Sequence, residues 1–257
     1  MAAIRLRKKR CAGGGAWDTE CSESFPGETH IADDPHKRLI VAIDGPAGAG
    51  KSTIARSLAE RLGIAYVDSG AMYRAVALWA LEAHIDLDDP FRLEQLAKQT
   101  RIEFIAPGNN VLLNGEDVTT KIREPRVSDA ASKVASVPGV RRAMRDEQRR
   151  IGSGQSLVME GRDIGTVVFP DARVKIYLDA HPEARAERRA NEIGASVEEI
   201  AREMIERDTR DRTRAEAPLT QAPDAEYVDS TGLTLEQVED AILKIVRART
   251  SNGKAAN

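Results

Sequence analysis

A glycine-rich octapeptide carries the clearest chemistry in this sequence. It matches the phosphate-binding pattern G-x-x-x-x-G-K-[ST] and reads Gly45-Pro46-Ala47-Gly48-Ala49-Gly50-Lys51-Ser52. Glycines let a backbone wrap closely around a phosphate with its N–H groups turned inward, and a following helix adds the positive end of its dipole. Lys51 can reach the β- and γ-phosphates, and Ser52 can ligate Mg²⁺. The sequence therefore predicts an ATP site over residues 45–53, ending at Thr53.

Two arginine-rich segments could bind a further highly charged group. The first contains Arg141, Arg142, Arg145, Arg149 and Arg150. The second is the run RDTRDRTR over residues 207–214. A charge run is ordinarily a solvated, salt-bridged helix face. In the second run, however, spacings of three and four residues place Arg207, Arg210 and Arg214 on one face. Converging guanidiniums suit an anion of high charge, such as phosphate, so this run is predicted to be functional.

Two further arginines each follow a predicted strand. Arg74 ends the segment DSGAMYR, and Arg162 lies in EGRD. In open α/β sheets, ligands bind beyond the carboxyl ends of the strands. A lone arginine after a strand is usually a surface residue, but two at the edge that carries the phosphate loop favour a shared binding site.

The elements that must position these residues alternate between strand and helix. Apolar runs predict buried strands at residues 39–44, 64–67, 156–159, 173–178 and 226–228. Helical spacing of apolar residues follows most of them, at residues 51–62, 73–80, 182–191, 197–207 and 235–246. Strands alternating with helices in this way predict a parallel sheet with helices on both faces, the three-layer P-loop NTPase fold of the α/β class.

One segment departs from this alternation. Between predicted helices at 91–100 and 127–150, the second broken near Pro138, the chain reads as three short strands at 101–105, 111–113 and 118–120. Asn114-Gly115 between apolar runs is a strong hairpin signal. The sequence predicts a small antiparallel insert over about residues 100–122.

Composition narrows the possible functions. The chain has 257 residues with 38 basic and 41 acidic side chains, a net charge of −3 and a pI of about 5.9. This balance argues against a general nucleic-acid or anionic-membrane binder. Only two cysteines occur, no stretch is apolar enough to span a membrane, and the four histidines lack metal-ligand spacing. We expect a cytoplasmic protein, in which residues 1–37 form a disordered or atypical tail.

The motifs IDGPAGAGKST, DSGAMYR, EGRDIGTVVFPDA and ERDTRDRTRAEAPL together resemble bacterial cytidylate kinases, within the nucleoside monophosphate kinase family. The resemblance runs from about Leu39 to the C-terminal helix. It implies one kinase domain over residues 38–257, with a monophosphate-binding insert at about 92–131 and a helical lid at about 195–217. It also implies transfer of the γ-phosphoryl group of ATP to CMP and dCMP with Mg²⁺, by a protein expected to be a monomer. Glu160 stands where an Asp can also occur, and no change of function is expected from it.

The resemblance assigns roles to matching positions. The phosphate of the acceptor would be held by Ser69, Arg74, Arg162 and Arg214. The cytosine edge would be read by Ser132, Arg141 and Asp163, and the ribose by Arg207 and Asp211. Tyr73 is counted among the substrate-binding residues, although its helical position is more typical of a core side chain. The catalytic set would be Lys51, Arg162, Asp163 and Arg210, the last belonging to the lid over ATP.

Two alternatives remain open at this point. The acceptor could instead be UMP or a small alcohol such as shikimate, although a shikimate kinase would not need the antiparallel insert. The chain could also be a nucleotide-binding switch without turnover. A guanine-reading Asn-Lys-x-Asp motif is missing and the arginines are many, which argues against a switch.

Overall fold

The computed structural model describes residues 38–105 and 110–251. The prediction for residues 1–37 and the turn predicted around Gly108-Asn109 lie outside the described residues. Within the described part of the chain, no helix is long and apolar enough to cross a membrane.

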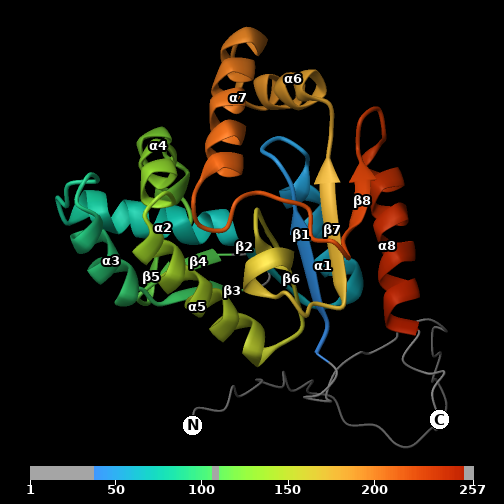
Figure 1. The fold of residues 1–257 in the computed structure, drawn as a ribbon, viewed down its shortest axis with the longest axis horizontal. Coiled ribbons are helices and arrows are strands. Elements are labelled where there is room, and N and C mark those ends of the chain that lie inside the picture. Colours follow the sequence, from blue (N-terminus) through green and yellow to red (C-terminus); the bar gives the residue numbers. More distant parts are fainter. Residues whose placement is uncertain (1–37, 106–109, 252–257) are drawn as a thin grey trace, which may run out of the picture. The chain divides into compact units, whose positions relative to one another are not determined.

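A five-stranded parallel sheet forms the centre of the fold, with strand order β2-β6-β1-β7-β8 (Figure 1). Its strands are β1 (Ile40–Asp44), β2 (Ala65–Asp68), β6 (Leu157–Gly161), β7 (Val174–Asp179) and β8 (Glu226–Asp229). Each predicted strand is confirmed to within two residues at either end. Asp44 of β1 is paired with Gly161 of β6 on one side and with Tyr177 of β7 on the other, and Asp68 of β2 is paired with Glu160 of β6. The carboxyl ends of the central strands therefore meet at one edge, as predicted.

Helices cover both faces of this sheet, which confirms the three-layer α/β prediction. Because side chains alternate along a strand, Val41 and Ile43 of β1 face α1 and α8, whereas Ala42 faces the α2 side. The helices nearest the sheet are α1 (Lys51–Leu62), α2 (Ser69–Glu82), α5 (Pro138–Gly154) and α8 (Leu235–Ser251). The hydrophobic effect thus fixes the sheet between two apolar clusters, and its carboxyl edge stays open for the site.

The predicted antiparallel insert is confirmed as a three-stranded sheet of order β3-β4-β5. It is flanked by helices on the α2 side of the molecule (Figure 1). The elements are α3 (Pro90–Lys98), β3 (Ile102–Ile105), β4 (Asn110–Leu113), β5 (Glu116–Asp117), η1 (Lys121–Arg123) and α4 (Pro125–Val134).

The position predicted for the third strand of the insert, residues 118–120, is wrong. Asn114 and Gly115 both have positive φ, at 50° and 89°, as a two-residue hairpin turn requires. This turn pairs Leu113 directly with Glu116. The strand therefore begins and ends earlier than the apolar pattern suggested.

Two further helices lie at the end of the sheet that carries the phosphate loop. They are α6 (Pro182–Ile193) and α7 (Val197–Thr213), which share a small apolar cluster of their own. Helix α7 continues six residues past its predicted end, so most of the RDTRDRTR run is helical. A second unpredicted feature is η2, a five-residue π-helix at Ile164–Val168 that follows Asp163 directly.

Candidate active site

The phosphate loop, residues 45–52, leaves β1 and enters α1 as predicted. Gly45 (φ 150°) passes so close to β7 that a Cβ there would lie 1.9 Å from the Leu178 carbonyl oxygen. Gly50 adopts a left-handed conformation (φ 88°) and is the N-cap of α1. Only glycine meets both demands without strain. The N-terminus of α1 is consequently turned toward the carboxyl edge of the sheet, where a phosphate would gain from its dipole.

Lys51 is buried and held inside this loop. Its Nζ donates to the Pro46 carbonyl oxygen at 2.6 Å. Desolvation by burial, followed by the positive charge of Arg162, lowers the pKa of Lys51 well below its ordinary value. An ammonium that the folded protein stabilises so poorly would gain strongly from an incoming phosphate.

Asp44 is an acidic neighbour that the sequence analysis did not select. Its carboxylate accepts the N–H groups of Ile164 and Gly165, at 2.8 and 2.7 Å, across the top of β1. Burial raises the pKa of Asp44 to about 6, in spite of these two hydrogen bonds. The contact holds the start of the π-helix, and with it the preceding Arg162-Asp163, beside the phosphate loop.

The surroundings of Ser52 are compatible with a magnesium ion held mainly by ATP. Ser52 is exposed at the start of α1, and its hydroxyl forms a hydrogen bond with the buried carboxylate of Glu160. The same carboxylate accepts a hydrogen bond from the Tyr66 hydroxyl at 2.6 Å. Burial raises the pKa of Glu160. Among the described residues, no three acidic, histidine or cysteine side chains form a metal cage. One hydroxyl with one nearby carboxylate fits Mg²⁺, which usually keeps its waters and substrate phosphates as ligands.

Asp163 lies at the centre of the predicted base-reading group. It is 9% exposed and accepts from Arg141 at 2.7 Å through Oδ2 and from Arg214 at 3.2 Å through Oδ1. The Arg141 guanidinium also lies 5.6 Å from the ring centroid of Tyr73, a cation–π distance. Residues from α2, α5, the end of β6 and the end of α7 thus meet at one point.

A second ion pair joins the sheet edge to α7. Arg162 Nε donates to Asp211 at 2.8 Å, and Arg214 lies 3.6 Å from the other oxygen of the same carboxylate. The charges of this pair also reach Arg207, because desolvation and then the positive charge of Arg162 lower the pKa of Arg207 to about 10. The arginines outnumber their acidic partners here, so the site has excess positive charge that an anionic ligand would neutralise.

Arg74 and Ser69 lie at the start of α2, beside this cluster. Arg74 pairs with Asp68 at 2.6 Å. Ser69 is buried, and its Oγ would be 2.7 Å from a Cβ on Gly161, so only glycine fits at that point of the EGRD motif. Both residues are therefore adjacent to the strand end that carries Arg162.

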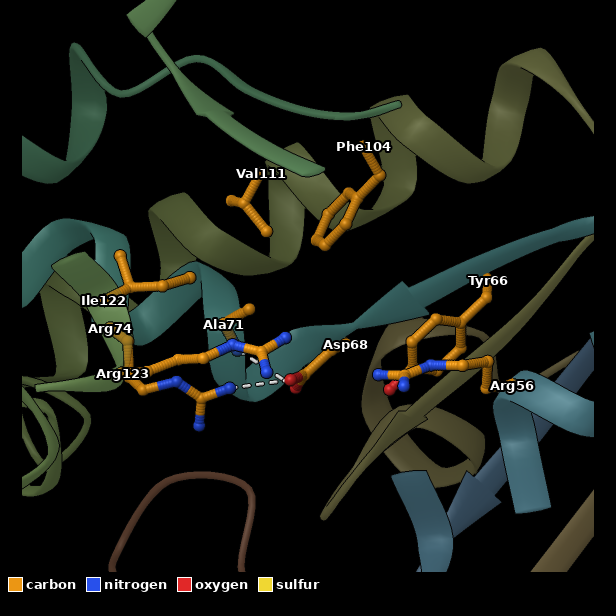
Figure 2. Close-up of a pocket in the computed structure, with 9 residues that line it drawn as sticks. All are labelled: Arg56, Tyr66, Asp68, Ala71, Arg74, Phe104, Val111, Ile122 and Arg123. Atoms are coloured by element: carbon orange, nitrogen blue, oxygen red, sulfur yellow. Dashed lines mark hydrogen bonds and ion pairs between the residues drawn. The ribbon is translucent and has the colours of Figure 1, made fainter. Parts of the chain in front are cut away.

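Behind Arg74 the seam between core and insert encloses a small cavity. Figure 2 shows Arg74 turned toward Asp68, with Phe104 and Val111 of the antiparallel sheet above them. The cavity has a volume of about 20 Å³, enough for about one water. It is therefore too small to be a nucleotide site, and it marks where the insert packs against the core.

Arg210 and Ser132, predicted to serve opposite substrates, contact each other. Arg210 Nη1 donates to the Ser132 hydroxyl at 2.5 Å, joining α7 to α4. This contact puts the predicted lid arginine next to the predicted acceptor side.

Two buried donors in the site lack protein partners. Among the described residues, the Nε atoms of Arg74 and Arg141 are buried without a hydrogen-bond acceptor. Buried polar groups are normally satisfied, and both belong to side chains predicted to bind substrate. A polar ligand between α2 and α5 is a natural acceptor for them.

Sequence reasoning missed the residues that support the loop from outside. Arg185 and Asp208 form an ion pair at 2.7 Å that contacts Ala47, and Ser230 donates to the Ala49 carbonyl oxygen at 3.3 Å. Arg185 lies in an ordinary charged helix, and Asp208 within the RDTRDRTR run. Neither has a local signal that separates it from a solvated charge, because only the fold brings them to the loop.

Comparison with known proteins identifies the family. The sequence model of the family "Cytidylate kinase" matches residues 41–248. A cytidylate kinase of Solibacter usitatus is 60% identical over 231 residues, covering 87% of this chain and 99% of that protein. One of Pelotomaculum thermopropionicum is 50% identical over 222 residues, covering 83% and 96%. A shikimate kinase from Acinetobacter baumannii shows a weaker likeness in fold, with a TM-score of 0.42 and 18% identity over 85% of this chain and 96% of that one. By the extent of its match to the first two, the chain belongs to the cytidylate kinase family.

Proposed function

We propose that the protein transfers the γ-phosphoryl group of ATP to CMP, and also to dCMP, forming the corresponding diphosphate and ADP. The observation that supports this acceptor best is the buried Arg141–Asp163 pair beside the phosphate loop. Cytosine presents an amino donor next to ring acceptors. A carboxylate can accept from the amine, and an arginine can donate to the acceptors.

The same pair would discriminate against uracil. Uracil presents a carbonyl oxygen where cytosine has its amine, so this oxygen would face the Asp163 carboxylate. Because a site built around hydrogen bonds strongly rejects an analogue that leaves them unpaired, UMP should be the poorer acceptor. Ser132 would complete the reading of the base, with Tyr73 packed against Arg141.

The remaining residues would hold the charged parts of both substrates. Ser69, Arg74, Arg162 and Arg214 would bind the acceptor phosphate, and Arg207 and Asp211 the ribose. Residues 45–53 would bind ATP, with Lys51 and Arg210 neutralising the transferred group. Phosphoryl transfer needs positioning and charge neutralisation more than covalent chemistry, so arginines and a lysine suffice. Asp163 would orient the acceptor.

Magnesium bound through Ser52 and the ATP phosphates would neutralise charge on the transferred group. The chain's own contribution is to keep water away. Helices α6 and α7 adjoin the phosphate loop, and residues 195–217 would act as the lid that covers ATP, while residues 92–131 would receive the monophosphate. Exclusion of water would suppress ATP hydrolysis.

The near-neutral net charge of −3 supports action on two small molecules and not on nucleic acid, and the protein is proposed to act as a monomer. We place this activity in the cytoplasm, where both nucleotides are available. The test is ADP release from ATP and Mg²⁺ with CMP, dCMP, UMP, AMP or shikimate as the acceptor.

Fast ADP release with CMP and dCMP and slow release with the other acceptors is the expected result. Preference for another acceptor would keep the reaction but overturn the roles of Ser132, Arg141 and Asp163. ADP release that does not depend on any acceptor would favour a nucleotide-binding switch.

A further inference from the structure

A buried ion pair connects the phosphate loop to α6 and α7 from outside the substrate site. Arg185 of α6 is 5% exposed and Asp208 of α7 is 7% exposed, and Nη1 and Oδ2 lie 2.7 Å apart. Arg185 Nη1 also donates to the Ala47 carbonyl oxygen at 2.9 Å, and Nε to the Ala180 carbonyl oxygen at 3.0 Å. One guanidinium thus joins the end of β7, the phosphate loop and α7.

The apolar contacts follow the same path. Ala47 packs against the small cluster of α6 and α7, which includes Met204. A Cβ on Gly48 would lie 2.7 Å from Met204 Cε and 3.1 Å from the Arg185 carbonyl oxygen. The two helices therefore press directly on the first half of the loop, and the ion pair lies within a packed interface.

The contact with Ala47 fixes the direction of one peptide plane. In a planar trans peptide, the carbonyl of one residue and the N–H of the next point in opposite directions. Because the Ala47 carbonyl is tied outward to Arg185, the N–H of Gly48 is turned away from α6. A phosphate loop works through N–H groups that face its interior.

The neighbouring peptides have anchors of other kinds. The Pro46 carbonyl accepts from Lys51 and the Ala49 carbonyl from Ser230. Arg185 supplies the anchor between them, and it is the one that comes from the α6–α7 pair. Asp208 holds the guanidinium in place and also accepts weakly from the Ala47 N–H at 3.4 Å.

We infer that the Arg185–Asp208 pair is a positioning device that sets the Ala47–Gly48 peptide for ATP and links occupancy of the phosphate loop to the placement of α7. Neither residue touches substrate in this scheme, and both act through the loop backbone. The inference rests on the proposed ATP site. It adds that ATP affinity depends on a contact outside that site.

The test separates positioning from simple stability. Replacing a buried ion pair by apolar side chains of similar volume is often neutral or stabilising. The double variant Arg185→Met/Asp208→Leu should therefore retain the melting temperature within a few degrees but lose the anchor on Ala47. Binding of a non-hydrolysable ATP analogue with Mg²⁺, measured by calorimetry without acceptor, should weaken by about tenfold to a hundredfold, the range for a hydrogen bond to a charged group.

Binding of CMP alone should weaken much less than binding of the ATP analogue in the same variant. The residues of α7 and its C-terminal end that are proposed to bind CMP include Asp211 and Arg214, and these are also held by Arg162 and Asp163. Glu192→Gln is the matched control, because it removes the exposed Arg189–Glu192 ion pair of the same helix, α6. It should leave nucleotide binding unchanged. If the double variant fails to fold, Asp208→Asn keeps the shape and tests the same contact, with a smaller loss of the same sign.

The outcomes distinguish this inference from the proposed function. Unchanged ATP-analogue affinity in a folded variant would overturn the positioning role while leaving the kinase intact. Equal losses for the ATP analogue and for CMP would also overturn it, because they would indicate general damage. A parent protein that binds no ATP analogue would instead refute the proposed function.

Discussion

Replacing Lys51 with methionine should stabilise the protein while abolishing most of its activity. The ammonium is buried and donates to the Pro46 carbonyl oxygen. Methionine has a similar length but no charge to desolvate. The two effects have opposite signs because the same charge that destabilises the free loop would bind the β- and γ-phosphates.

The size of the stability effect follows from the direction of the pKa shift. Desolvation, then Arg162, lowers the pKa of Lys51 from its ordinary 10.5. Each unit of lowering corresponds to about 1.4 kcal/mol by which the folded state disfavours the charged form. The shift to about 7 therefore corresponds to about 4–5 kcal/mol, and after the loss of the bond to Pro46, about 1 kcal/mol, a net gain of about 3–4 kcal/mol remains. In a protein of this size each kcal/mol raises the melting temperature by about 2–4 °C, so the expected rise is on the order of 10 °C.

The sign of the pH dependence provides a second check. A lysine with a lowered folded-state pKa makes the unfolded chain bind more protons over the interval up to 10.5. The parent therefore gains stability as the pH rises through that interval. The excess stability of Lys51→Met should shrink from neutral pH toward pH 10.5, as measured by thermal unfolding in a pH series.

The effect on activity is measured as the rate of ADP release with CMP as the acceptor at saturating ATP. Loss of an electrostatic stabiliser of the transition state is worth about 10²–10³ in kcat, and we expect Lys51→Met to fall at the upper end. Lys175→Met is the contrasting control: Lys175 is also buried but pairs with Asp224 at 2.8 Å. It should lower the melting temperature and leave kcat within about twofold.

Two results for Lys51→Met would contradict this prediction in different ways. If Lys51→Met melted several degrees below the parent yet retained near-parental kcat, the ammonium would be a structural group and the phosphate loop would not act through it. A lower melting temperature with lost activity would refute the electrostatic argument alone.

Three further predictions concern the acceptor side, the sheet edge and the tail. Arg141→Met should raise the KM for CMP at least about tenfold and the KM for ATP much less, because Arg141 contacts Asp163, Tyr73 and Ala135 and, within the described part of the chain, no residue of the phosphate loop; equal effects would contradict base reading. The pKa of Asp44 is raised to about 6, so between about pH 4 and 6 the folded protein binds a proton on this carboxyl that the unfolded chain has lost. The parent should therefore lose stability relative to Asp44→Asn as the pH rises through that interval. A difference in melting temperature between the two proteins that does not change with pH would show that the Asp44 carboxyl does not titrate in this way. Deleting residues 1–36 should leave kcat and both KM values unchanged, and a large loss would show that the tail takes part.

The sequence predicted those features that depend on local patterns. The order of strands and helices follows from apolar periodicity, and the conformation of the phosphate loop from its glycines. The hairpin at Asn114-Gly115 was also predicted, but the end of its third strand was not. Turn geometry, which pairs Leu113 with Glu116, decides that register, and the apolar side chain of Val118 misled the sequence reasoning because it is buried without being part of a strand.

The parts that could not be predicted depend on contacts between distant segments. Arg185 and Asp208 are 23 positions apart and Ala47 lies well over a hundred positions before them, so no spacing rule connects them. The π-helix after Asp163 is similar, because its first N–H groups bond to Asp44, 120 positions away. Charged residues of this kind look like solvated surface in the sequence, and only the fold reveals their burial.

The alternation of Arg and Asp in the run 207–214 has a physical reason that the structure supplies. Guanidiniums close enough to bind one phosphate repel each other before it arrives, as the lowered pKa of Arg214, caused by burial and then by Arg141, indicates. Asp163 and Asp211 lie between the arginines and hold them apart in fixed directions. The acids do not neutralise the cluster fully, so the remaining positive charge still favours an anion. A run of arginines alone would be repelled into solvent, and a fully paired run would bind nothing, so the observed ratio suits a site that must stay folded when empty and still attract nucleotide phosphates.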